Sequence, residues 1–272
     1  MTAESTWRVS DEPTPLETLD AALYARLQVP AIQPGDVPDT TFYSALCRDG
    51  THVLEMGCGA GRIAQAVLES SPHCRLTGVD LHRGLLARAR DRMTADQRPR
   101  ATWVEDDLTT CDLGAVFDRV IMPFTTFFAF PGLPAKRAAL ALARRHTAPG
   151  GVFALDCYAI DDGADLEPQT PHDTGWDWLN PLPATADSGE AQVEERNMVL
   201  GPPGVIEVQY RFHRSEAPDA PHVQSVRHHF VSAATTVRLL IEAGFDHAEV
   251  YGGFDGRPYD EESVVMVVIA EP

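Results

Sequence analysis

Residues 53–62 read V-L-E-M-G-C-G-A-G-R, and this stretch decides the fold class. A strand is expected over 51–56, and a helix over 61–70. A strand, a glycine loop and a helix in this order can present backbone N–H groups and a helix N-terminus to a ligand. The stretch therefore predicts a cofactor site at a strand end of an α/β fold.

The spacing of the glycines separates two kinds of cofactor. A dinucleotide loop follows G-x-G-x-x-G, in which the third glycine lets the helix pack closely on the strand. Counted from Gly57, that third position falls on Arg62, and Gly61 comes one residue early. Glu55 would repel a pyrophosphate but attract an ammonium group, directly or through water. The loop therefore favours S-adenosylmethionine, which has an amino-acid end, a cationic sulfonium and no phosphate, over NAD.

Outward from this loop, predicted strands and helices alternate, which indicates a parallel sheet covered on both faces. The expected strands are at 51–56, 75–80, 101–105, 117–122, 151–158, 247–252 and 263–270. The expected helices are at 16–28, 38–48, 61–70, 83–94, 134–147 and 233–243. The fold class is therefore α/β, with a Rossmann-like sheet of seven main strands.

An insertion interrupts this alternation after the fifth strand. Residues 161–195 contain ten Asp or Glu and no Lys or Arg, and long irregular loops of this kind often act as lids. Strands expected at 191–200, 205–212 and 222–231 would form a small antiparallel sheet. We therefore predict three regions: N-terminal helices and cofactor core at 1–160, a cap at 161–232, and the remaining core at 233–272.

Composition and charge limit the classes of function. A net charge of −18 argues against a nucleic-acid partner, because such binding depends on basic surface. No apolar run approaches the ~18–20 residues of a membrane span, and the N-terminus lacks a signal-peptide pattern, so we expect a cytoplasmic protein. The five scattered cysteines and the lack of clustered ligands indicate neither a disulfide framework nor a metal site. A homodimer is compatible with the sequence.

Asp80 lies where S-adenosylmethionine needs a carboxylate. It ends the strand at 75–80, 25 residues after Glu55, where its oxygens can accept hydrogen bonds from both ribose hydroxyls. Leu81 and Leu85 follow and are expected to form apolar walls for the base. One aspartate at a strand end is an ordinary turn residue, so the argument depends on its position after the glycine loop.

A further acid follows the next strand. Asp107, in W-V-E-D-D-L, could accept a hydrogen bond from the adenine amino group, and the backbone N–H of Leu108 could donate to a ring nitrogen. Three acidic signals on successive strands of an alternating pattern favour one shared ligand.

These stretches resemble class I S-adenosylmethionine-dependent methyltransferases over roughly residues 20–272. The matching motifs are V-L-E-M-G-C-G-A-G-R, G-V-D-L-H-R-G-L-L-A-R-A-R, V-E-D-D-L, F-D-R-V-I-M-P-F-T-T-F and P-G-G-V-F-A-L-D. The resemblance implies a sheet whose last strand is antiparallel and a cofactor bound across the ends of the first strands. The expected loop contacts are Gly57, Gly59, Gly61 and Arg62. Asp106 stands where relatives often have glycine, and it is the alternative to Asp107.

The position of the cap is similar to that in small-molecule N-methyltransferases acting on amino sugars and glycine, and in their secondary-metabolite relatives. It implies in-line methyl transfer to a small-molecule acceptor, with an amine as the favoured group. O- or C-methylation, and use of the cofactor without methyl transfer, stay open. A dinucleotide oxidoreductase is disfavoured by Glu55 and Arg62.

Residues after the fourth strand are expected beside the methyl group. Met122 and Pro123 are placed at the cofactor, and Phe124 and the residues after it on the acceptor side. Some nucleic-acid and protein-glutamine methyltransferases carry N/D-P-P-Y or F here. The sequence M-P-F-T differs, which disfavours those substrates.

The catalytic candidates lie elsewhere in the chain. Tyr24 and Tyr43, in the N-terminal helices, could contact the methionine end or the acceptor. His228 and His229 are adjacent on the last cap strand and must face opposite sides. We expect His228 to face the site.

Overall fold

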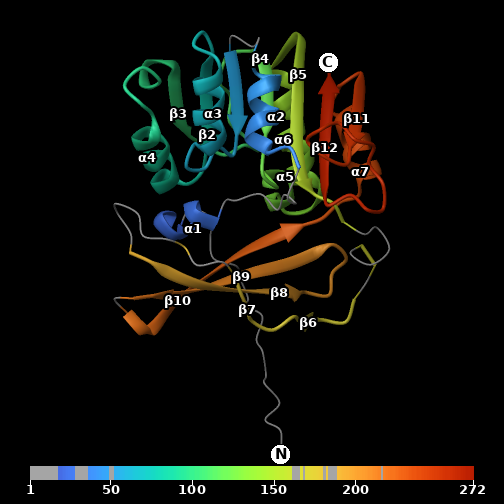
Figure 1. Ribbon diagram of the computed structural model, residues 1–272. Coiled ribbons are helices and arrows are strands. Elements are labelled where there is room, and N and C mark those ends of the chain that lie inside the picture. Colours follow the sequence, from blue (N-terminus) through green and yellow to red (C-terminus); the bar gives the residue numbers. More distant parts are fainter. Residues whose placement is uncertain are drawn as a thin grey trace, which may run out of the picture.

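The computed structural model describes residues 18–27, 36–48, 52–160, 166–167, 169–179, 182, 189–215 and 217–272. These residues form a seven-stranded sheet and a second, antiparallel sheet on one side of it (Figure 1). The order in the large sheet is β11-β12-β5-β4-β1-β2-β3. The predicted seven-stranded α/β fold is therefore confirmed.

The strands of the large sheet begin and end close to the expected residues. They are β1 (His52–Met56), β2 (Arg75–Asp80), β3 (Ala101–Glu105), β4 (Phe117–Met122), β5 (Thr147–Tyr158), β11 (His247–Tyr251) and β12 (Val265–Glu271). The first five pair in parallel. β12 runs antiparallel to both of its neighbours, β5 and β11, as the resemblance implied.

Helices cover both faces of this sheet because its strands are apolar on both sides. In β1, Val53 packs into a core with α2 (Asp39–Leu46) and α3 (Arg62–Ser70). Its neighbour Leu54 points the other way, into a core with α6 (Gly132–His146) and α7 (Ala233–Glu242). The strand alternation also places Glu55 on the face of α3.

Several boundaries differ from expectation. β5 begins at Thr147 rather than at residue 151, because Thr147 already pairs with Phe117 before a shift in register. Two short helices were missed, α5 (Thr126–Ala129) and a 3₁₀ helix at Arg98–Arg100. α1 (Ala21–Leu27) is shorter than the predicted 16–28, because Asp20 Oδ1 caps it by accepting from the N–H of Ala22. Residues 16, 17 and 28 lie outside the described residues.

The second sheet is the predicted antiparallel cap, built from β8 (Ala191–Val199), β9 (Val205–Arg214) and β10 (Ala217–His229). Two short strands that the sequence did not indicate, β6 (His172–Asp173) and β7 (Asp177–Trp178), pair with β8. Figure 1 shows α1 between the cap and the large sheet. Leu23 of α1 forms a small core with Val193 and Phe212 of the cap. The division at 160/161 and 232/233 stays a prediction.

All five cysteines are buried and free. Within the described ranges, no helix is both long and apolar enough to span a membrane.

Candidate active site

Two cavities lie between the large sheet and the cap. The strand-end cavity, of about 370 Å³, is lined by residues after β2, β3 and β4. The cap cavity, of about 710 Å³, is lined by α1, β5 and the three long cap strands. Both volumes suit a small-molecule ligand. The cavities share one wall, made of Tyr24, Phe124, Thr125, Val226 and His228.

The glycine loop needs glycine for its backbone conformation. Gly57, Gly59 and Gly61 have φ of +74°, +51° and +73°, which side chains rarely tolerate. Gly57 lines the strand-end cavity, and a Cβ there would lie 2.5 Å from Cγ2 of Thr126. The loop therefore approaches the segment after β4 more closely than alanine would allow.

The sequence predicted that the N–H groups of this loop face a ligand, but three of them bond to the end of β2. Gly57 and Cys58 donate to the carbonyl of Val79, at 2.8 and 3.1 Å. Gly59 donates to Oδ2 of Asp80 at 2.8 Å. The loop is thereby fixed to the end of β2, and these three donors are not left free for a ligand.

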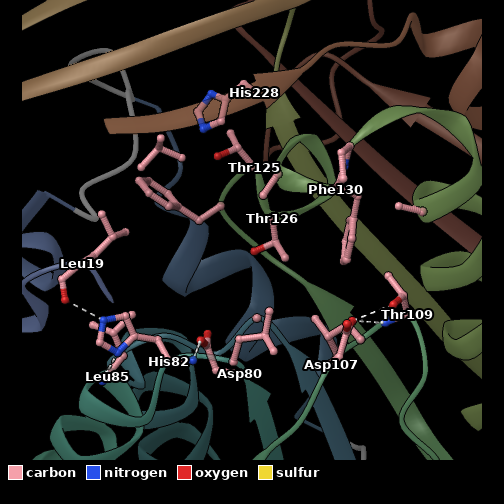
Figure 2. Close-up of a pocket in the computed structure, with 18 of the residues that line it drawn as sticks. Leu19, Asp80, His82, Leu85, Asp107, Thr109, Thr125, Thr126, Phe130 and His228 are labelled. Carbon is pink, nitrogen blue, oxygen red and sulfur yellow. Dashed lines mark hydrogen bonds between the residues drawn. The ribbon is translucent and has the colours of Figure 1, made fainter. Parts of the chain in front are cut away.

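Asp80 lies in the wall of the strand-end cavity (Figure 2). Its Oδ2 accepts from Gly59, and its Oδ1 accepts from the N–H of His82 at 2.8 Å. Each carboxylate oxygen keeps further acceptor capacity. Burial raises the pKa of Asp80, in spite of these two backbone hydrogen bonds. Leu81 and Leu85 line the same cavity.

Asp107, rather than Asp106, reaches this cavity. Asp107 lines the wall, and its Oδ1 accepts from the N–H and the hydroxyl of Thr109, both at 2.7 Å (Figure 2). Asp106 is exposed and lines neither cavity. Leu108 lies beside Asp107 in the wall. Figure 2 shows Asp80 and Asp107 on one side of the cavity and His228 opposite.

Glu55 lies behind the loop. One carboxylate oxygen accepts from the N–H of Ala64, while Oε2 is buried without a hydrogen-bond partner. Burial raises the pKa of Glu55 to about 8, although Arg62 opposes the shift. Glu55 lines neither cavity. A buried acceptor without a donor is costly, so an ammonium group bound through water would satisfy it.

Seven predicted cofactor residues line neither cavity, namely Glu55, Gly59, Gly61, Arg62, Asp106, Met122 and Pro123. Arg62 binds both carboxylate oxygens of Asp39, at 2.8 and 2.6 Å, which joins α3 to α2. Met122 is fully buried in the core. Pro123 is buried, and its carbonyl accepts from the hydroxyl of Thr126 at 2.8 Å. Packing between distant segments directs these side chains away from the cavities, and the spacing of residues in the sequence did not reveal that packing.

The shared wall contains a strained backbone. Phe124 and Thr125 have φ of +54° and +58°, although neither is glycine. Such residues persist only where neighbours hold them, and they cluster at functional sites. Asp156 holds both, because its Oδ1 accepts from the N–H of Phe124 and its carbonyl accepts from the N–H of Thr125, each at 3.0 Å. The sequence carried no local signal for this contact.

The two candidate tyrosines have different surroundings. Tyr24 lines both cavities, and burial, together with the charge of Asp80, raises its pKa to about 12. Tyr43 is fully buried, lines neither cavity, and donates to Oδ1 of Asp156 at 2.6 Å. The structure therefore brings Tyr24 to the site and places Tyr43 behind it, as a support for Asp156.

His228 faces the site and His229 does not. His228 lines both cavities, and its Nδ1 is hydrogen-bonded to the hydroxyl of Tyr158. Burial lowers its pKa to about 4, so its imidazole is neutral at pH 7. His229 lines neither cavity.

His82 was missed by the sequence analysis. Its Nδ1 accepts from the N–H of Leu85 at 3.2 Å, which caps α4 (Arg83–Arg92). Its Nε2 lies 2.8 Å from the carbonyl of Leu19 (Figure 2). Because Nδ1 accepts, the network assigns the proton to Nε2. His82 therefore ties the segment before α1 to α4 and closes one end of the strand-end cavity.

The charged side chains that line the cap cavity are two acids and one base. The carboxylates of Asp156 and Glu195 line it, together with the guanidinium of Arg26. The hydroxyl of Tyr210 hydrogen-bonds Glu195, and burial together with that carboxylate raises the pKa of Tyr210. Among the residues that the structure describes, no group of three or more His, Cys, Asp or Glu could hold a metal ion.

Part of this core is similar to known proteins. Residues 53–151 match the model of a methyltransferase domain. A ubiquinone/menaquinone biosynthesis C-methyltransferase of Paracoccus denitrificans is 35% identical over 106 residues, 38% of this chain and 41% of the relative. A trans-aconitate 2-methyltransferase of Azoarcus is 28% identical over 111 residues, 39% of each chain. The chain thus spans about two fifths of the length of these relatives.

Solved structures share the fold over nearly the whole chain. The CcbJ methyltransferase from Streptomyces caelestis has a TM-score of 0.70 at 18% identity, covering 88% of this chain and 91% of that one. The sugar N-methyltransferase KedS8 from Streptoalloteichus has a TM-score of 0.69 at 19% identity, covering 100% and 99%. These structures confirm the expected fold, and the match of residues 53–151 agrees with the expected kind of domain.

Proposed function

We propose that this chain transfers a methyl group from S-adenosylmethionine to a small-molecule acceptor, because residues 53–151 match the model of a methyltransferase domain. The observation that carries the proposal is the wall shared by the two cavities. A cofactor in the strand-end cavity and an acceptor in the cap cavity would meet at Phe124, Thr125 and His228. This arrangement supports methyl transfer between a cofactor in one cavity and an acceptor in the other.

The residues of the strand-end cavity fit the cofactor. Asp80 keeps acceptor capacity for ribose hydroxyls, and Leu81 and Leu85 supply apolar walls for the base. Asp107 can accept from the adenine amino group. The unsatisfied Oε2 of Glu55 can take the ammonium of the methionine end through water. When bound, S-adenosylmethionine supplies an electrophilic methyl group attached to a positively charged sulfur.

The protein's own part is to align the acceptor and exclude water. Alignment of two reactants can remove about 7–11 kcal/mol of a barrier. The strained pair Phe124–Thr125 fixes the shape of the shared wall, to which Tyr24 of α1 also belongs. His228 is neutral at pH 7 and a weak base, since its pKa is about 4. Its proposed part is to accept a hydrogen bond from the acceptor's N–H or O–H and to take that proton only as the methyl group is transferred.

We propose an amine as the acceptor group and a role in secondary metabolism. The two carboxylates of the cap cavity, Asp156 and Glu195, favour a cationic ligand, and KedS8 is described as a sugar N-methyltransferase. O- or C-methylation is the alternative, since the Paracoccus relative is named a C-methyltransferase. Use of the cofactor without methyl transfer is a third. The cytoplasmic location and the homodimer stay predictions.

A labelled-methyl assay tests the proposal. The protein is incubated with methyl-labelled S-adenosylmethionine and a panel of amino sugars, amino acids and matched alcohols. We expect label in amines, with S-adenosylhomocysteine as the second product. Calorimetry should show that S-adenosylhomocysteine binds and that NAD does not. Binding of NAD but not of S-adenosylhomocysteine would contradict the proposal, and binding without label in any acceptor would favour the third alternative.

The role of His228 has its own test. His228→Ala should lower turnover by about a hundredfold while leaving the affinity for S-adenosylhomocysteine intact, because a positioned proton acceptor contributes roughly that factor. His229→Ala is the matched control, since the neighbouring imidazole lines neither cavity. Equal turnover in both variants would exclude a proton-transfer role for His228.

A further inference from the structure

Asp156 is a buried carboxylate for which the sequence analysis assigned no role. It lies in β5, is 4% exposed and lines the cap cavity. Its Oδ1 accepts two hydrogen bonds, from the hydroxyl of Tyr43 at 2.6 Å and from the N–H of Phe124 at 3.0 Å. Among the described residues, none donates to Oδ2. One oxygen of this carboxylate is therefore fixed, and the other keeps its acceptor capacity for a ligand.

The hydrogen bonds of Asp156 also connect it to the shared wall. Phe124 and Thr125 both donate backbone N–H groups to Asp156, and both line the two cavities. A carboxylate held in this way keeps its position when a ligand binds, because its orientation is fixed by the fold. A group bound to Oδ2 would lie on the acceptor side of the wall that separates the cavities.

Charge favours one kind of ligand at this oxygen. Burial raises the pKa of Asp156 to about 6, although the bonds from Tyr43 and Phe124 and the charge of Arg62 oppose the shift. The carboxyl is thus mainly ionised at pH 7 and above. The guanidinium of Arg62 is engaged with Asp39 and lines neither cavity. A buried anion of this kind is stabilised by a cationic donor.

We infer that Asp156 is the specificity-determining residue of the cap cavity and that its Oδ2 binds the ammonium group of the acceptor. The inference rests on the proposed function, since it assigns the cap cavity to the acceptor. It selects a primary or secondary amine over an alcohol of the same shape, because a hydrogen bond to a charged donor is stronger than one to a hydroxyl.

Glu195 is the competing candidate within the same cavity. It lies on β8, and its carboxylate is already engaged by the hydroxyl of Tyr210 and by Nδ2 of Asn197 at 3.4 Å. Both groups that hydrogen-bond Glu195 thus belong to the cap. Asp156, in contrast, is bonded to the strained pair at the junction of the two cavities.

Two probes of equal shape test the inference. Cyclohexylamine and cyclohexanol are titrated at pH 8 into protein saturated with S-adenosylhomocysteine, and binding is followed by ligand-observed NMR. The wild-type protein should bind the ammonium probe about tenfold more tightly than the alcohol, as expected for a hydrogen bond to a charged group. Asp156→Asn should reduce this preference to less than about twofold, because the amide keeps the shape and the Oδ1 bonds but loses the charge.

Three controls make the result decisive. Glu69→Gln removes an exposed charge of α3 and should keep the tenfold preference. Saturation with S-adenosylhomocysteine shows that Asp156→Asn is folded and that the cofactor part of the proposed function holds. Loss of the preference in Glu195→Gln but not in Asp156→Asn would overturn the inference. Equal binding of the two probes to the wild-type protein, or binding of neither, would overturn it as well.

Discussion

The two cavities are built in different ways, although they share a wall. In the strand-end cavity, Asp80 ends β2 and Asp107 follows β3, and each accepts from a backbone N–H two positions further along the chain, while Asp80 also accepts from the N–H of Gly59. The cap cavity takes its polar groups from β5, β8, β9 and α1, which are far apart in the chain. The first is therefore a local structure and the second a product of the whole fold.

This difference separates the effects that substitutions should have. Changes at the strand ends should act on cofactor affinity and on stability together, because the same hydrogen bonds hold the loop and line the cavity. Substitutions in the cap should change only the binding of the acceptor.

Gly57→Ala should lower the free energy of unfolding by about 4 kcal/mol, the sum of left-handed strain and overpacking. The new Cβ would lie 2.5 Å from Cγ2 of Thr126. Gly114→Ala is the matched control, because Gly114 has a φ of +60° but no atom within 4 Å of the added Cβ. Chemical denaturation measures both. Equal losses in the two variants would show that the close approach to Thr126 costs nothing.

Asp80→Ala should weaken binding of S-adenosylhomocysteine by about a hundredfold. It removes the acceptor for the ribose and leaves the N–H groups of Gly59 and His82 without partners. Calorimetric titration measures the loss. Asp91→Asn, an exposed charge change on α4, should bind like the wild-type protein. If Asp80→Ala bound S-adenosylhomocysteine with wild-type affinity, the ribose would not bind at Asp80.

The affinity for S-adenosylhomocysteine should depend on pH through Glu55, whose pKa is about 8 without ligand. An ammonium group favours the carboxylate, so binding releases a proton below that pKa. The affinity should rise by about tenfold from pH 6 to pH 7 and level off above pH 8. Calorimetry in buffers of different ionisation enthalpy counts the proton. Glu55→Gln should lose the dependence, and persistence of the dependence in that variant would assign it to another group.

His82→Ser should weaken binding of S-adenosylhomocysteine by about fivefold, the worth of one net hydrogen bond. Serine keeps the cap of α4 but cannot reach the carbonyl of Leu19. His82→Ala loses both contacts and should also lower the melting temperature. If serine restored full affinity, the contact with Leu19 would have no part in closing the cavity.

Tyr210→Phe should change the affinity for S-adenosylhomocysteine by less than about twofold, since the lost hydrogen bond lies within the cap. The same titration as for Asp80→Ala applies. A loss comparable to that of Asp80→Ala would show that the two cavities are energetically coupled, which contradicts the separation drawn above.

The same contrast explains what the sequence could predict. Asp80 and Asp107 each follow a strand that has a clear apolar pattern, so strand alternation was enough to place them at one edge of the sheet. The cap strands were predicted for the same reason. Gly57, Gly59 and Gly61 were recognised by spacing, and the structure adds that all three require a positive φ.

The remaining site residues depend on contacts that no local pattern encodes. The strain at Phe124 and Thr125 is held by Asp156, which lies about thirty residues further along the chain. His82 reaches Leu19 over 63 positions, and Tyr43 reaches Asp156 over 113. Met122 was predicted at the site because it ends the fourth strand, and Tyr43 because it lies in the N-terminal helices, but packing directs both side chains into the core.

In the complex with S-adenosylmethionine, the cofactor's sulfur should lie at the wall shared by the two cavities. A crystal structure of the protein with S-adenosylhomocysteine tests it most directly. We expect the ribose at Asp80, the adenine beside Asp107, and the sulfur facing Phe124, Thr125 and His228, with the cap cavity open on the other side. A ligand bound in the cap cavity, or a sulfur directed away from the shared wall, would contradict the account.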